Sequence, residues 1–107
     1  MIEIPSKFTI GGQDLNVKFV PSIDGGAVGQ CNLIGGVIKL ATNFGESEIP
    51  VSVLFNTFWH ETVHAILDTM GETELTTNEK FVSCFSGFLC EAFRSMEFDN
   101  YDETKTT

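Results

Sequence analysis

The stretch PVSVLFNTFWHETVHAILDTMG, residues 50–71, contains both histidines of the chain and a long helical pattern. Its apolar residues recur with the period of an α-helix, and Gly71 follows them as a typical residue for the position after a helix end. These apolar residues are Val51, Phe55, Phe58, Trp59, Val63, Ile66 and Met70. The pattern predicts one helix that packs an apolar face against a core.

Two β-hairpin patterns precede this helix, and Pro50 marks the change from one kind of pattern to the other. Residues 6–20, SKFTIGGQDLNVKFV, alternate in polarity on both sides of Gly11-Gly12, and residues 27–43, AVGQCNLIGGVIKLATN, do so around Gly35-Gly36. The segment PSIDGGAVG between them lacks the pattern of a phosphate-binding loop and is typical of a turn. We expect a small antiparallel sheet made of two hairpins.

A second helical pattern follows the polar loop ETELTT, residues 72–77. Its apolar stripe consists of Phe81, Val82, Phe85, Phe88, Leu89, Phe93 and Met96. The ten phenylalanines of the chain predict an aromatic core shared by one sheet face and both helices. The expected class is α+β, with the sheet packed on two C-terminal helices in a single domain, residues 1–107, whose polar end, residues 99–107, is flexible.

The composition narrows the classes of partner. Six Lys and Arg against fifteen Asp and Glu give a net charge of −9, which disfavours nucleic acid as a partner. No segment reaches the length of a membrane span, and the N-terminus has no export signal, so we expect no membrane association. Three cysteines without a CxxC pair favour reduced thiols and a cytoplasmic location. The sequence does not indicate an oligomeric state.

His60-Glu61-Thr62-Val63-His64 forms an HExxH motif inside the first predicted helix. Histidines four residues apart lie on one helical face, where both imidazoles can reach one ion at about 2.0–2.1 Å. Glu61 is rotated by about 100° from His60, a position beside the ion that suits a general base. Chance alone gives this motif in roughly three of a thousand such sequences, so we interpret it as a zinc site.

A catalytic zinc ion usually takes three protein ligands, and the third one here is expected to be a carboxylate. The candidates after the motif are Asp68, Glu72, Glu74 and Glu79. Asp68 lies too far along a straight helix, while Glu72 and Glu74 fit ordinary surface acids. Glu79 opens the second helix and is preferred. Its alternative role is structural, because Thr76 and Glu79 also fit a capping box that would serve the helix terminus alone.

The motif helix, the short loop and the segment NEKFVSCFSGFL together resemble small zinc metallopeptidases of bacteriophages and prophage regions, which are similar to minimal gluzincins. The resemblance covers the chain from about Val17 to Phe93 and includes a hairpin of the form GxC/D…IxL before the motif. It implies a zincin-like fold in which His60, His64 and Glu79 bind zinc and Glu61 is the general base. It also implies a phage protein that acts in the cytoplasm of a bacterial host.

Two departures from larger gluzincins stand out: the spacing from His64 to Glu79 is short, and no later histidine is present to stabilise an oxyanion. Asn78, Arg94, Tyr101 or the zinc ion alone remain as candidates for that role.

The expected reaction is hydrolysis of a peptide bond, in which zinc activates a water molecule and Glu61 accepts its proton. The edge of the second hairpin, residues 36–41, is a candidate surface for an extended peptide or protein substrate, or it is an ordinary sheet edge blunted by Lys39. The alternatives to a zinc endopeptidase are a zinc-binding regulatory module with little or no turnover and a metal-free helical interaction protein.

Overall fold

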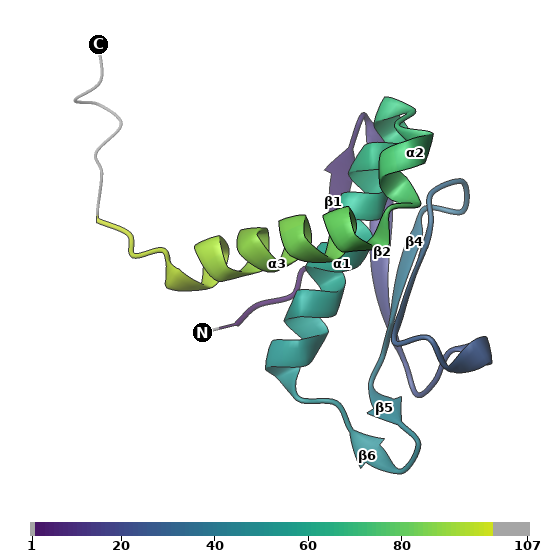
Figure 1. The fold of residues 1–107 in the computed structure, drawn as a ribbon. Coiled ribbons are helices and arrows are strands. Elements are labelled where there is room, and N and C mark those ends of the chain that lie inside the picture. The colour runs from purple at the N-terminus through teal and green to yellow at the C-terminus, as the bar shows by residue number, and fades with distance from the viewer. Residues whose placement is uncertain (1, 100–107) are drawn as a thin grey trace.

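This computed structural model describes residues 2–99 of the chain (Figure 1). These residues contain six strands, three α-helices and one 3-10 turn, joined by loops. The strands are β1 (Lys7–Ile10), β2 (Gln13–Val20), β3 (Gly29–Asn32), β4 (Val37–Ala41), β5 (Asn43–Phe44) and β6 (Ser47–Glu48). The helices are α1 (Val51–Met70), α2 (Thr73–Thr76) and α3 (Glu79–Ser95), and the 3-10 turn is η1 (Asp24–Gly26). The class is α+β, as expected.

Both expected hairpins form, but the prediction of an antiparallel sheet is wrong. The strand order is β1-β2-β4-β3, and the two inner strands, β2 and β4, pair in parallel with Val17 opposite Ile38. This arrangement places the inward residues of both hairpins next to each other. Those residues are Leu15, Val17, Ile38 and Leu40, all of which are buried. The mixed sheet therefore follows from the burial of one continuous apolar face.

Helix α1 confirms the prediction for residues 51–70, and Gly71 ends it in the left-handed conformation at φ 76°. The helix lies against the sheet on one side and against α3 on another, so it forms the middle of the molecule (Figure 1). Phe55, Phe58 and Ala65 join the core of the sheet, while Val63 and Leu67 pack with Val82 of α3. Because α1 is enclosed on two sides, its buried residues do not lie along a single stripe.

The expectation that all phenylalanines are core residues is wrong. In α3 the buried positions are Val82, Ser86 and Cys90, whereas Phe85 and Phe88 are 46% and 71% exposed. Small residues at the contact allow α3 to approach α1 closely, and the bulky rings are left on the outer face. The phenylalanines classed as exposed are Phe19, Phe44, Phe85, Phe88, Phe93 and Phe98.

The loop predicted for residues 72–77 contains the single-turn helix α2, which packs against both long helices. Of the predicted flexible end, residues 99–107, only Asp99 falls within the described residues. Among the helices of residues 2–99, none has the length and apolar character needed to cross a membrane.

Candidate metal centre

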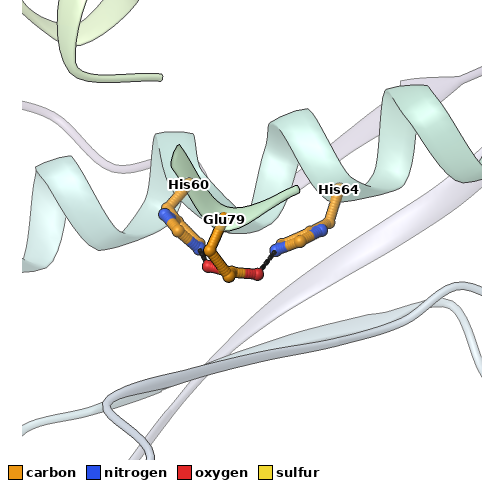
Figure 2. A group of neighbouring side chains, drawn as sticks. All are labelled: His60, His64 and Glu79. Atoms are coloured by element: carbon orange, nitrogen blue, oxygen red, sulfur yellow. Dashed lines mark ion pairs between the residues drawn. The ribbon is translucent and has the colours of Figure 1, made fainter. Parts of the chain in front are cut away.

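Three side chains from two helices meet at one point (Figure 2). His60 and His64 project from adjacent turns of α1, and their ring centroids are 5.0 Å apart. Glu79, the first residue of α3, lies between the rings: its Oε2 is 3.3 Å from Nε2 of His60 and its Oε1 is 3.4 Å from Nε2 of His64. The structure thus brings together the three residues predicted to bind zinc, with ligand atoms within 4.8 Å of one another.

The donor atoms of this group could hold a metal ion, since they lie within 4.8 Å of one another. The two nitrogen-to-oxygen distances join the histidines to different oxygens of the Glu79 carboxylate. Two imidazole nitrogens and one carboxylate oxygen also form a donor set that catalytic zinc uses. Within residues 2–99 no other histidine, cysteine or acidic side chain joins this group.

The protonation state of His60 also favours a cation at this point. Burial lowers the pKa of His60, the neighbouring His64 lowers it further, and Glu79 opposes both effects. A neutral imidazole is the form that binds a metal ion, whereas an ion pair with Glu79 needs the protonated form. Because the side chain of Glu79 is 66% exposed, such an ion pair would add little stability.

Glu79 is not part of a capping box, so that alternative is wrong. The N-cap of α3 is Asn78, whose side chain accepts a hydrogen bond from the N–H of Phe81 at 3.1 Å. This places Glu79 one residue inside the helix, where its carboxylate is free of any capping role. The short α2 holds the chain in position for this start, because the N–H of Asn78 donates to the carbonyl of Leu75.

Thr76 contributes to the site in a way that the sequence did not suggest. Its Oγ1 lies 2.9 Å from Nδ1 of His64, the ring nitrogen opposite the one that faces Glu79. A hydroxyl that accepts a hydrogen bond from Nδ1 fixes the tautomer in which Nε2 is free to bind an ion. The available signal was a threonine between the two long helices, which the sequence pattern marks only as a capping-box residue.

The other acidic candidates lie elsewhere. Asp68 is exposed on α1, one turn after His64, and lines a cavity together with residues 30–34. Glu72 and Glu74 are exposed at the start of α2. None of them belongs to the group of ligand atoms found within residues 2–99. The site therefore depends on Glu79 for its carboxylate.

Glu61 points away from solvent at the contact between α1 and β3, and only 8% of it is exposed. Burial raises its pKa to about 7, and the charge of Glu79 adds to this effect. The close approach of β3 depends on Gly29, since a Cβ atom there would lie 2.5 Å from the methyl group of Thr57 and 3.0 Å from Oε2 of Glu61. Gly29 is a second residue of the site whose role the sequence reading missed.

The predicted peptide-binding edge, residues 36–41, is not an edge. Strand β4 lies between β2 and β3, so its backbone groups are already paired on both sides. The strands at the borders of this sheet are β1 and β3, and β3 runs beside α1. A cavity of about 330 Å³ opens where β3 begins, and it is lined by Val28, Gly29, Asn56, Thr57, His60 and Glu61.

Two of the candidate oxyanion stabilisers can be placed relative to the site. Arg94 lies fifteen residues after Glu79 on α3, which separates them by about 22 Å along the helix axis. Asn78 lies next to Glu79, but its side-chain oxygen is used in the N-cap. Tyr101 lies outside the described residues. Arg94 is therefore excluded, and Asn78 could contribute only through its amide NH₂ group.

Comparisons with known proteins add no relative: no protein-family model, no curated protein and no solved structure matches the chain.

Proposed function

We propose that this protein is a zinc metallopeptidase of the HExxH type, with a zincin-like arrangement similar to that of small phage gluzincins. The observation that carries the proposal is the meeting of His60, His64 and Glu79 with ligand atoms within 4.8 Å of one another, and with Glu61 buried one residue after the first of them. Two imidazoles and a carboxylate leave one corner for the reacting groups, which distinguishes a catalytic zinc site from a closed structural one.

Each residue of the site has a distinct role in the proposed reaction. His60, His64 and Glu79 would hold the ion, and Thr76 would orient His64. A bound zinc ion would supply a Lewis acid that polarises the peptide carbonyl and acidifies water. Glu61 would accept a proton from the attacking water and return it to the leaving amine.

A peptide or protein is the substrate class that fits the surroundings of the site. The border strand β3 runs beside α1, with Gly29 against Thr57 and Glu61, so an extended chain added to β3 would lie near the motif helix. The cavity at Val28 and Asn56 would take one of its side chains. The expected activity is that of an endopeptidase.

A second candidate is a zinc-binding regulatory or interaction module with little or no turnover. It is favoured by the lack of an assigned oxyanion donor, because Arg94 is remote and only the amide NH₂ group of Asn78 is available. A site that binds zinc without a donor aimed at the developing negative charge loses a large part of its rate.

The decisive experiment combines metal content with cleavage of a peptide library. Native mass spectrometry of the purified protein should show about one zinc ion per chain, and His60→Ala or His64→Ala should lose it. Mass spectrometry of the digested library should show cleavage by the parent protein, with Glu61→Gln keeping zinc and losing activity.

Full zinc in either histidine variant would refute the site. Zinc in the parent protein without any cleavage would favour the binding module. Equal rates for Glu61→Gln and the parent would show that Glu61 is not the base.

A further inference from the structure

A second cavity, of about 520 Å³, lies at Asp68, four residues after His64 on α1, whereas the cavity at Asn56 lies before and at the start of the motif. It is lined by Gln30, Cys31, Asn32, Leu33, Ile34 and Asp68. Five of these residues belong to β3 or to the turn that follows it, and Asp68 comes from α1. The cavity therefore lies between the border strand and the motif helix, as the first one does.

The two elements run in the same direction past the metal ligands. Gly29, at the start of β3, lies against Thr57 and Glu61, and Ile34, just beyond its end, shares the cavity with Asp68. An ion held between His60 and His64 is level with the middle of the motif, about 9 Å along the helix axis from Asp68. An extended peptide advances by about 3.3–3.6 Å per residue, so two or three residues span this distance.

Asp68 is the one acidic or basic amino acid among the residues that line this cavity. Within residues 2–99 its carboxylate has no ion-pair partner, because the ion pairs found there join Lys7 to Asp14 and the two histidines to Glu79. The negative charge acts on the cavity itself: the pKa of Cys31 is raised to about 11 mainly by burial, and also by Glu61 and Asp68. A cationic side chain would therefore be attracted into this cavity.

We propose that the cavity at Asp68 selects substrates that carry a lysine or arginine two or three residues from the cleaved bond. This inference rests on the proposed peptidase function and names the class of its substrates. The cavity on the other side, at Val28, Asn56 and Thr57, has no charged residue apart from the catalytic Glu61 and the ligand His60. The two sides of the bond are thus recognised differently, and the preference for a basic residue belongs to the side near Asp68.

The test uses peptides anchored at the metal. In one series a zinc-binding hydroxamate group is attached at the C-terminus and in another at the N-terminus, so that both sides of the site are sampled. Within each series the peptides are isomers: a single lysine moves from one position to the next and the net charge stays constant. Binding is measured by competition on zinc-loaded protein, and cleavage of a peptide library is measured in parallel.

We expect one series to show a preferred lysine position two or three residues from the hydroxamate, with affinity at least about threefold above its isomers. Asp68→Asn should abolish the preference, and Asp68→Lys should transfer it to peptides with glutamate at that position. Asp99→Asn, a matched change of an exposed aspartate beyond the end of α3, should keep it. Because Asp68 is exposed, these variants should fold normally.

The outcomes separate this inference from the proposed function. A lysine preference that depends on Asp68, in a protein that cleaves nothing, would support the cavity and reject the peptidase. Cleavage without a basic preference, or a preference that persists in Asp68→Asn, would overturn the inference alone. A failure of every hydroxamate to bind, together with a lack of cleavage, would overturn both.

Discussion

The hydroxyl oxygen of Thr76 lies 2.9 Å from Nδ1 of His64, and this contact joins the turn between the helices to the motif helix. The same turn places Asn78 at the N-cap of α3 and Glu79 beside both histidines. The short segment from Thr76 to Glu79 therefore both contacts His64 and places Glu79 beside the two histidines. This explains how Glu79 can reach the two histidines although it follows His64 by only fifteen residues.

Thr76→Val should weaken zinc binding by about tenfold or more, because it removes the hydroxyl that fixes the His64 ring and keeps the shape of the side chain. Competition with a fluorescent chelator provides the measurement. Thr77→Val is the matched control, since within residues 2–99 the hydroxyl of Thr77 bonds only to the carbonyls of Thr73 and Glu74. Equal zinc affinity in the two variants would show that the contact of Thr76 with His64 is incidental.

The variants Glu79→Gln and Asn78→Ala should separate the proposed metal-ligand role of Glu79 from the N-cap role of Asn78. Glu79→Gln should lower zinc affinity by about tenfold or more with little loss of stability, because an amide is a poor zinc ligand and Glu79 is not the cap. Asn78→Ala should cost about 1 kcal/mol of stability through loss of the N-cap, with a smaller effect on zinc affinity.

Chelator competition and urea denaturation of both variants test this pair of effects. Zinc affinity in Glu79→Gln within about threefold of the parent protein would reject the ligand role, since even residues behind the ligands usually contribute more.

Gly29→Ala should reduce peptide cleavage strongly while zinc remains bound, because the new methyl group would collide with Thr57 and press on the carboxylate of Glu61. Adding Thr57→Ser should restore part of the activity, since it removes the methyl group at 2.5 Å. The rates should be compared with those of Gly87→Ala, where an added Cβ meets no atom within 4 Å and should stabilise α3 by about 1 kcal/mol. Full activity in Gly29→Ala would mean that β3 can move without disturbing Glu61.

The sequence predicted those features that depend on local periodicity. The 3.6-residue pattern and Gly71 gave the extent of α1, and the paired glycines gave the turns of both hairpins. The HExxH spacing placed two histidines on one face, and the need for a third ligand singled out Glu79. Each of these predictions uses residues that are close together in the chain or a rule of coordination chemistry.

Features that depend on contacts between distant segments were predicted wrongly. The parallel pairing of β2 with β4 is determined by which apolar faces meet, and either arrangement of two hairpins satisfies their local patterns. The outward position of Phe85 and Phe88 follows from the close packing of Ser86 and Cys90 against α1. Asn78 and not Thr76 is the N-cap, because α2, a single turn, changes where α3 begins.

Glu61 gives a prediction about the metal-free protein that does not depend on turnover. Its pKa is raised from 4.5 to about 7 in the folded state, so the folded chain binds a proton more tightly than the unfolded chain. The free energy of unfolding should therefore fall as pH rises from about 4.5 to 7, and the loss is complete above that range. A shift of this size corresponds to an upper limit of about 3 kcal/mol.

Glu61→Gln should remove this loss, because a neutral amide does not ionise in the buried position. In the presence of a chelator, urea denaturation should show the variant to be more stable than the parent at pH 8 by about 1–3 kcal/mol. The difference between the two proteins should shrink as the pH falls to 5, and comparing the two at each pH cancels the titration of His60, which both share. Glu46→Gln, in the turn between β5 and β6, is the control and should give no such pH-dependent difference. A difference that stays constant from pH 5 to 8 would show that Glu61 is ionised throughout and is not poised to exchange a proton near neutrality.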